Sequence, residues 1–256
     1  MRGGFCKIVR DYMVLREQQT QNYFIVEGNI GAGKSTFLEV IKKYLNVQVV
    51  REPHTKWQQV GGEHNLLDAF YKDMPRWAYT FQTYAFVSRV IEQQEHAKSN
   101  PYSIQVLERS VFSDRYCFAK NAYESGNMNA LEWKLYQEWF NWLVDGYIPK
   151  PAGFIYLQVD PAVCYERLRK RNRSEEETVA LAYIQQLHAY HEQWLIRKEL
   201  VAESLRDIPV LTLTCDRDFE HDRYEQEKHM DQIVAFFAMI GGAVSASDHV
   251  NYTLVK

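Results

Sequence analysis

The run Phe24-Ile-Val-Glu-Gly-Asn-Ile-Gly-Ala-Gly-Lys-Ser-Thr36 contains a complete G-x-x-x-x-G-K-S/T phosphate-binding loop, from Gly28 to Ser35. The preceding Tyr23–Val26 predicts a strand, and the following Thr36–Tyr44 has a helical pattern, which is the context that this loop requires. Glycines let backbone N–H groups turn toward a phosphate, and the helix N-terminus adds a positive partial charge. We expect Lys34 to reach the outer phosphates and the Ser35 hydroxyl to bind the metal. The sequence therefore predicts a site for a nucleoside triphosphate and its magnesium.

The composition is that of an ordinary globular protein, and it argues against some classes of binding partner. The chain has 256 residues, of which 46% are hydrophobic and 25% charged, enough to bury the core of one large α/β domain. A net charge of −3 argues against a nucleic acid or an anionic membrane as the main partner. No apolar run of the sequence approaches the roughly 20 residues that a membrane span needs.

The four cysteines and the first 22 residues bear on the compartment. Cys6, Cys117, Cys164 and Cys215 are far apart and none belongs to a C-x-x-C pair. We therefore expect reduced thiols in a reducing compartment, rather than a zinc site or a disulfide framework. The first 22 residues carry four basic and two acidic side chains and no secretory apolar core. These features favour a cytoplasmic protein, with a mitochondrial location as the alternative.

Five short apolar runs predict strands, and longer helical patterns lie between them. This alternation predicts an α/β fold with a parallel sheet of about five strands and helices on both faces. Ligands bind at the carboxyl ends of the strands in such sheets, so polar residues that follow a strand are candidates for the site. The expected strands are Tyr23–Val26, Val47–Arg51, Ser103–Leu107, Gly153–Val159 and Pro209–Leu213.

Acidic residues directly follow two of these strands. Glu52, in a Glu-Pro turn after the second strand, could take a proton from an attacking hydroxyl, although taken alone a solvated turn carboxylate is the commoner role. Glu108 and Arg109 follow the third strand, where phosphate-loop enzymes place an acidic residue that holds magnesium. Charges directly after a core strand are hard to solvate, so we favour a functional role for this pair over a surface ion pair.

Basic side chains are concentrated in residues 167–173, and acidic residues follow them. Arg167 and Arg171 are four residues apart, so they share one face of a helix. Such a segment can close as a lid over a triphosphate and neutralise charge on the transferred group. A basic run is more often a solvated helix face, and it is the phosphate loop that favours the lid here.

Residues 76–86 have a helical pattern that is unusually rich in aromatic side chains. Most of them are expected in the core, but Gln82 lies among apolar neighbours and a buried amide must satisfy its polar groups. The edge of a base offers a matching donor and acceptor, so we expect a base pocket with walls from Trp57, Tyr71 and Phe118. The aromatic cluster between residues 133 and 147 favours a packed helix or a subunit interface.

Taken in order along the chain, these motifs resemble those of the deoxynucleoside kinases, specifically the deoxycytidine/deoxyguanosine kinase branch. The similarity extends over roughly residues 23–238. It implies a P-loop kinase fold with an Arg-rich lid, with an N-terminal extension over 1–22, a kinase domain over 23–240 and a tail over 241–256. The motifs are Glu27–Thr36, Glu52-Pro53 with Trp57, Arg76 to Arg89, Glu108 to Tyr116, Tyr156-Leu-Gln158, Arg167 with Arg171–Arg173, and Glu175-Glu176.

The resemblance implies roles in ATP-dependent phosphorylation of a deoxynucleoside. Glu52 would be the general base for the 5′-hydroxyl, with Arg109 and Lys34 as the other catalytic residues, and Ser35 and Glu108 would hold Mg²⁺. The residues expected to bind ATP are Gly28, Asn29, Ile30, Gly31, Ala32, Gly33, Lys34, Ser35, Thr36, Arg167, Arg171, Arg173, Asp218 and Phe219. Those expected to bind the nucleoside are Glu52, Trp57, Tyr71, Phe81, Gln82, Arg89, Arg109, Asp114, Phe118 and Glu176.

The resemblance also bears on base preference and assembly. Arg89 and Asp114 match family positions at the far end of the base pocket, where members that favour thymidine are apolar and leave room for its 5-methyl group. An Arg–Asp pair fills that room, so we expect activity on deoxyguanosine, deoxyadenosine or deoxycytidine and weak activity on thymidine. A homodimer built from the helices around 128–146 is also implied.

Two other functions compete with this interpretation. A nucleoside monophosphate kinase shares the phosphate loop and the arginine lid, but it needs extra basic residues for an acceptor phosphate. A nucleotide-binding switch needs no Glu52, and the N-K-x-D base-recognition motif of GTPases is absent from the sequence.

Overall fold

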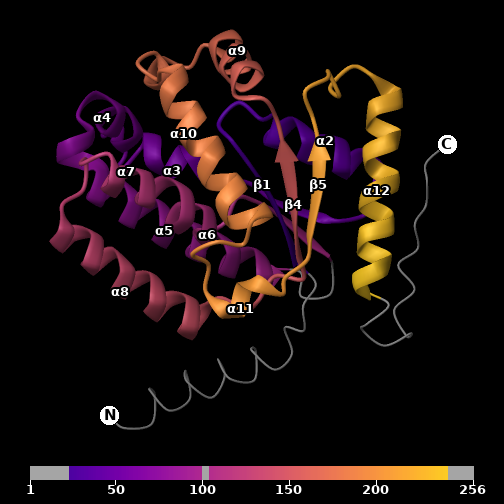
Figure 1. Cartoon of the computed structure of the whole chain (residues 1–256), viewed down its shortest axis with the longest axis horizontal. Coiled ribbons are helices and arrows are strands. Elements are labelled where there is room, and N and C mark those ends of the chain that lie inside the picture. Colours follow the sequence, from indigo (N-terminus) through magenta and orange to yellow (C-terminus); the bar gives the residue numbers. More distant parts are fainter. Residues whose placement is uncertain (1–22, 100–103, 242–256) are drawn as a thin grey trace, which may run out of the picture.

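A five-stranded parallel sheet forms the centre of the computed structural model, which describes residues 23–99 and 104–241 (Figure 1). The strand order is β2-β3-β1-β4-β5, so β1, which leads into the phosphate loop, is central. The predicted parallel α/β sheet is confirmed, and each predicted strand is found with ends shifted by at most two residues. The strands are β1 (Tyr23–Gly28), β2 (Gln48–Val50), β3 (Gln105–Glu108), β4 (Gly153–Gln158) and β5 (Val210–Thr214).

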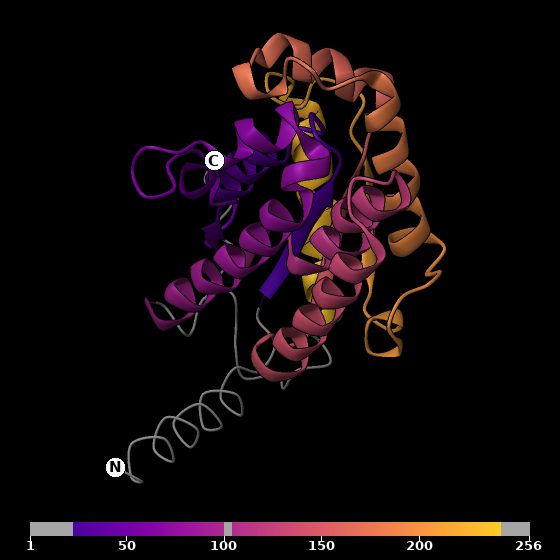
Figure 2. The same cartoon turned by 90° about the vertical axis from the view of Figure 1, so that its left-hand side faces the viewer.

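Helices cover both faces of the sheet. α2 and α12 contact each other beside β1 and β5, whereas α5, α8 and α10 gather on the opposite side (Figures 1 and 2). The helices are α2 (Lys34–Tyr44), α3 (His54–Gln58), α4 (Leu66–Lys72), α5 (Met74–Ser99), α6 (Val111–Ser113), η1 (Asp114–Ala119), α7 (Lys120–Glu124), α8 (Ala130–Tyr147), α9 (Pro161–Arg171), η2 (Ser174–Glu176), α10 (Leu181–His191), η3 (Glu192–Ile196), α11 (Glu203–Arg206) and α12 (Arg223–Gly241).

The turn after β3 is held in an uncommon backbone conformation. A capping box begins α6 directly after β3, because the Ser110 hydroxyl accepts from the backbone N–H groups of Phe112 and Ser113. Arg109 lies between strand and cap with φ 62°, in the left-handed region, and its backbone N–H donates to Val26 O at 2.9 Å. Such conformations persist where the surroundings fix them and are frequent at functional sites.

The core joins the sheet to its covering helices through large apolar side chains. Phe24 on β1 packs against Phe236 and Phe237 of α12, with ring centroids 5.9 and 4.0 Å apart. At Gly28 a Cβ would lie 2.9 Å from Leu157 O, so a side chain would push β1 and β4 apart. These contacts fix the strand that carries the phosphate loop.

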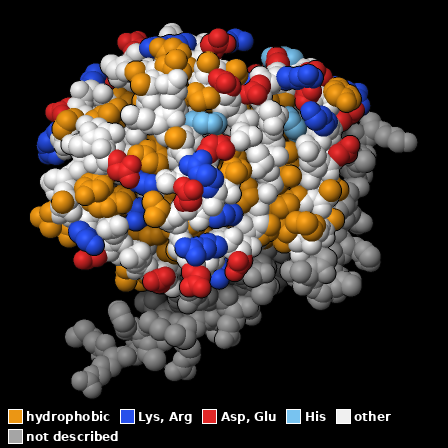
Figure 3. All heavy atoms as spheres, in the orientation of Figure 1, with side chains coloured by type: hydrophobic (Ala, Val, Ile, Leu, Met, Phe, Trp, Pro, Cys, Tyr) orange, Lys and Arg blue, Asp and Glu red, His pale blue; other side chains and the backbone are white. Residues whose placement is uncertain are grey.

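The surface offers no large field of one sign on the face drawn in Figure 3, where basic and acidic side chains are interspersed. Within residues 23–99 and 104–241, no helix has both the length and the apolar character needed to cross a bilayer. The predicted N-terminal extension and the tail beyond residue 241 lie outside the described residues.

Candidate active site

A cavity of about 790 Å³ opens where β1, β2, β3 and β5 end, at the carboxyl edge of the sheet. Most of the predicted site residues line it, and Gly28, Asn29 and Ala32 do not. The predicted residues that it brings together are Ile30, Gly31, Gly33, Lys34, Ser35, Thr36, Glu52, Trp57, Tyr71, Phe81, Gln82, Arg89, Glu108, Arg109, Asp114, Phe118, Arg167, Arg171, Arg173, Glu176, Asp218 and Phe219.

Hydrogen bonds on the side away from the cavity hold the phosphate loop in place. Asn29 donates through Nδ2 to Ile184 O at 2.8 Å, and its Oδ1 accepts from the Ile30 N–H at 2.8 Å. Asn29 therefore ties the loop to α10 and supports the site without lining it. At Gly33, where φ is 88°, a Cβ would lie 2.8 Å from Cζ of Phe219, so the phosphate loop and the segment after β5 that carries Phe219 meet closely here.

Lys34 begins α2 and is buried beneath the loop. Its Nζ donates to Asn29 O at 2.8 Å, which directs the ammonium group along the phosphate loop. Burial lowers the pKa of Lys34 to about 7, and the charge of Arg109 adds to this effect. A nearby anion favours the charged form of a lysine, so this residue is suited to a polyphosphate.

Ser35 and Glu108 form a pair of oxygen ligands at the floor of the cavity. The Ser35 hydroxyl donates to Glu108 Oε1 at 2.6 Å, and Glu108 Oε2 lies 3.5 Å from the backbone N of Glu52. A hydroxyl and a carboxylate are the hard oxygen donors that Mg²⁺ prefers, and a site with few protein ligands leaves room for water and phosphate oxygens. The pair fits the predicted magnesium site.

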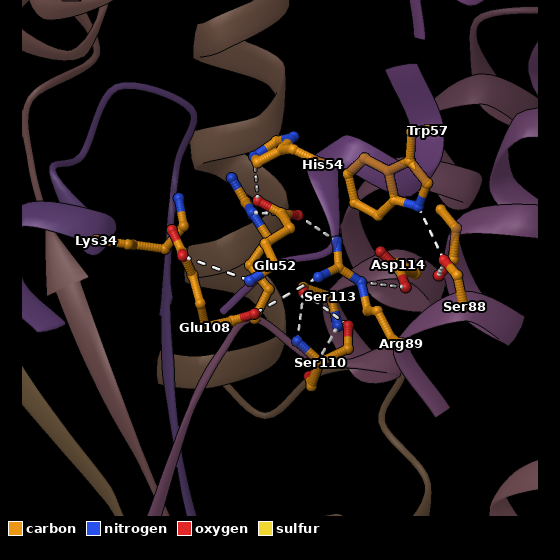
Figure 4. Close-up of polar contacts among 12 residues, drawn as sticks. Lys34, Glu52, His54, Trp57, Ser88, Arg89, Glu108, Ser110, Ser113 and Asp114 are labelled. Carbon is orange, nitrogen blue, oxygen red and sulfur yellow. Dashed lines mark hydrogen bonds and ion pairs between the residues drawn. The ribbon is translucent and has the colours of Figure 1, made fainter. Parts of the chain in front are cut away.

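Glu52 follows β2 and is surrounded by basic side chains (Figure 4). Its Oε1 accepts from Arg89 Nη2 and lies 3.5 Å from Arg109 Nε, while its Oε2 lies 3.0 Å from His54 Nε2. Burial acts to raise the pKa of Glu52, but the charges of Arg89, His54 and Arg109 outweigh it and hold this pKa well below its ordinary value. The side chain is therefore a carboxylate at neutral pH, the form that can accept a proton.

Arg89 links Glu52 to Asp114 and Trp57. Its Nε donates to Asp114 Oδ2 at 2.8 Å, and its guanidinium group lies 5.0 Å from the ring centroid of Trp57. Trp57 in turn donates through Nε1 to the Ser88 hydroxyl at 2.8 Å (Figure 4). The resemblance implied that Arg89 and Asp114 lie at the far end of a base pocket; in the structure the two are paired, and Arg89 also contacts the carboxylate of Glu52.

Aromatic rings form the walls around Gln82. Phe81 stacks on Phe70 with centroids 4.6 Å apart and meets Trp57 edge-on at 5.5 Å. The Gln82 side chain is 2% exposed and lines the cavity. An apolar slot with an amide at its side suits a flat heterocycle with donors and acceptors at its edge.

The lid arginines are held by protein groups at the mouth of the cavity. Arg171 Nη2 donates to both carboxylate oxygens of Glu176, at 2.7 and 2.6 Å, and Arg173 Nη1 lies 3.8 Å from the same carboxylate. Arg167 Nη2 instead donates to the backbone carbonyls of Cys215, Asp216 and Arg217 at 3.0 to 3.1 Å, and its Nη1 has no partner among the described residues. Arg167 therefore joins the lid to the segment after β5.

A second acidic residue of the lid fastens it to the opposite wall. Glu175 Oε1 accepts from Gln58 Nε2 at 2.8 Å and from Asn65 Nδ2 at 3.0 Å. The hydrogen bond from Asn65 is the largest of the effects that lower the pKa of Glu175 to about 2, against the raising effect of burial. The side-chain Oδ1 of Asn65 also caps α4 by accepting from the backbone N–H of Asp68. The hydrogen bond between Asn65 and Glu175 therefore ties η2 to α4, the helix that carries Tyr71.

Several residues of the cavity or its closure were not predicted as site residues, among them Phe70, Tyr183, Glu175 and His54. Phe70 and Tyr183 line the cavity from α4 and α10, but no motif or spacing in the sequence of either helix marked them. Glu175 was noted as part of an acidic run without its partners in α3 and α4. His54, directly after Glu52-Pro53, could have been suspected because it immediately follows a candidate base.

Comparison with known proteins agrees with this geometry. The family model described as deoxynucleoside kinase matches residues 24–238. Deoxycytidine kinase 2 of Gallus gallus is 42% identical over 238 residues, covering 82% of this chain and 88% of the relative. The mitochondrial deoxyguanosine kinase of Xenopus laevis is 39% identical over 241 residues (83% and 88%), and human mitochondrial thymidine kinase 2 is 35% identical over 219 residues (86% and 80%).

Proposed function

This chain belongs to the deoxynucleoside kinase family, and we propose that it transfers the γ-phosphoryl group of ATP to the 5′-hydroxyl of deoxyguanosine, deoxyadenosine or deoxycytidine. The observation that carries the proposal is the meeting of Glu52, Lys34 and the Ser35–Glu108 pair in one cavity beside an aromatic slot. Phosphoryl transfer depends on positioning and charge neutralisation more than on covalent chemistry.

In the proposed reaction, Glu52 takes the proton of the 5′-hydroxyl as its oxygen attacks the γ-phosphorus. The bond from that phosphorus to the β–γ bridging oxygen breaks, and ADP leaves. Arg109 supports Glu52 from the turn after β3, where its Nε lies 3.5 Å from Oε1. Lys34 neutralises charge on the transferred group from the phosphate loop.

We assign Mg²⁺ to Ser35 and Glu108, which present a hydroxyl and a carboxylate 2.6 Å apart. The ion would supply charge neutralisation on the β- and γ-phosphates when bound. The dependence of turnover on magnesium concentration checks this site, and Ser35→Ala should raise the concentration needed.

The lid and the donor segment complete the proposed complex. Arg171 and Arg173 exchange Glu176 for phosphate oxygens when the triphosphate binds, which leaves Glu176 and Tyr71 to hold the sugar 3′-hydroxyl. Phe219 packs against Gly33 and Asp218 lines the same cavity, which supports a role for both in contacting the donor nucleotide. Gln82, Phe81, Trp57 and Phe118 hold the base.

Kinetics with four deoxynucleosides and Mg·ATP test both the reaction and the base preference. We expect the kcat/KM for thymidine to lie below those for deoxyguanosine, deoxyadenosine and deoxycytidine, because Arg89 and Asp114, paired at 2.8 Å, would occupy the space that the family resemblance gives to a 5-methyl group. Deoxyguanosine should be phosphorylated and its monophosphate should not, which separates this activity from that of a monophosphate kinase. A thymidine kcat/KM above the other three values would contradict the base assignment.

A homodimer is proposed through the face that α5 and α8 form side by side (Figure 2). Leu131, Leu135, Trp139 and Trp142 are spaced along one side of α8, and Leu131 and Trp142 are 69% and 54% exposed. A row of exposed large apolar side chains on a soluble protein supports an interaction site at this face.

Sedimentation velocity tests the dimer. The wild-type protein should sediment at twice the chain mass, and Trp142→Glu should shift it to the monomer. Met239→Glu, an equally drastic change at an exposed position of α12, is the control and should remain dimeric. A wild-type monomer at micromolar concentration would contradict the proposal.

A cytoplasmic location remains our proposal, and two of the relatives above are mitochondrial by name. Cell fractionation distinguishes the two locations.

A further inference from the structure

His54 at the start of α3 contacts the carboxylate that we propose as the base. Its Nε2 lies 3.0 Å from Glu52 Oε2, and its ring meets the ring of Trp57 edge-on with centroids 5.1 Å apart (Figure 4). Its Nδ1 is enclosed and has no partner among the described residues. Since the carboxylate can only accept, Nε2 carries the proton that is shared with Glu52.

The two oxygens of the Glu52 carboxylate have different neighbours. Arg89 Nη2 and Arg109 Nε both approach Oε1, from α5 and from the turn after β3. His54 approaches Oε2. Because each carboxylate oxygen has about two lone-pair sites, the guanidinium groups crowd Oε1, while Oε2 keeps one site for a further hydrogen bond.

We propose that His54 is a positioning residue that fixes Oε2 of Glu52 as the oxygen that receives the 5′-hydroxyl proton. The proposal rests on the proposed role of Glu52 as the base. His54 donates its Nε2–H to one lone pair of Oε2 and thereby holds the other toward the acceptor hydroxyl. On transfer, the O–H bond of the sugar breaks, an O–H bond to Oε2 forms, and the new P–O bond replaces the bridging P–O bond of ATP.

The charges around the carboxylate explain why an imidazole suits this place. Arg89, Arg109 and Lys34 already act on Glu52 from three elements, and Asp114 offsets part of the charge of Arg89. A third guanidinium at Oε2 would weaken the base further, since nearby positive charge stabilises its ionised form. An imidazole instead orients the oxygen through a single N–H group, with its Nε2 3.0 Å from Oε2.

Single-turnover measurements of phosphoryl transfer, with saturating Mg·ATP and deoxycytidine, test the proposal. His54→Phe keeps a ring against Trp57 but removes the donor, and it should slow the transfer step roughly tenfold with the KM for ATP unchanged. His54→Gln places an amide N–H near the position of Nε2 and should stay within about threefold of wild type. His64→Phe, at an exposed histidine outside the cavity, is the matched control and should transfer at the wild-type rate.

Combining the His54 variants with Glu52→Gln separates the proposed role of His54 from the proposed role of Glu52 as the base. In the Glu52→Gln background, His54→Phe should cause no further loss, because its effect acts through that carboxylate. If Glu52→Gln is slow while His54→Phe matches wild type, the role of His54 is wrong and that of Glu52 stands. If His54→Gln is as slow as His54→Phe, the donor is not what matters and the proposal fails. If Glu52→Gln turns over normally, both proposals fall. Melting temperatures show that each variant is folded.

Discussion

Glu52→Gln should lower kcat by roughly 10²–10⁴ while leaving ATP binding nearly intact. The amide has the shape of the carboxylate but cannot accept the proton of the 5′-hydroxyl. The amide oxygen of the glutamine can still accept the hydrogen bond from Arg89. The substitution therefore removes the negative charge at position 52 without removing the packing against Arg89. Steady-state turnover with deoxycytidine and calorimetric titration with ATP measure the two quantities separately.

Glu63→Gln is the matched control for this experiment. Glu63 is exposed in the loop between α3 and α4 and does not line the cavity, so the same chemical change there should leave kcat unchanged. Loss of a buried partner of Arg89 and Arg109 can also destabilise the fold, and a thermal melt reveals this. Wild-type turnover by a folded Glu52→Gln enzyme would remove Glu52 from the role of base.

Lys34→Met should lower kcat by roughly 10²–10³ with Mg·ATP as the donor. The methionine fills the volume of the aliphatic part of the lysine but removes the charge beside the β- and γ-phosphates. Burial already lowers the pKa of Lys34 to about 7, so the neutral methionine is tolerated by the fold. The measurement is kcat and the KM for ATP, with the melting temperature as a check of folding.

Lys42→Met is the matched control, and it tests whether the effect depends on the position of the lysine that is lost. Lys42 lies on the same helix, α2, with its side chain 52% exposed beside Glu39, so its loss should leave kcat at the wild-type value. Equal turnover by the Lys34 and Lys42 variants would show that the phosphate-loop lysine does not stabilise the transferred group.

Much of the fold was predictable because it depends on local patterns. The phosphate loop required a strand before it and a helix after it, and both are present as β1 and α2. Short apolar runs separated by helical patterns gave the other four strands, since buried parallel strands are continuous in apolar residues. The strand order was not predicted, because order depends on contacts between segments that are distant in sequence.

The candidate site also has a part that the sequence predicted and a part that it did not. The sequence marked Glu52, Glu108 and Arg109 because each follows a strand, and the fold brings all three to one cavity. Their partners were not readable from spacing. Arg89 comes from the middle of α5 and contacts both Asp114 and Glu52. The lid residues Arg171 and Arg173 were predicted to bind phosphate, and that role stays a prediction while both contact Glu176.

By itself the sequence determined the strand–loop–helix unit, the class of sheet and the residue types available for phosphoryl transfer. Backbone sterics and the period of the apolar residues act over a few neighbouring positions, so they can be read from the chain. Only the tertiary structure decided that His54 faces Oε2 of Glu52 and that Glu175 fastens the lid to α3 and α4. Hydrogen bonds across the cavity depend on distances of a few ångströms between separate elements, and the packing of the whole core sets those distances.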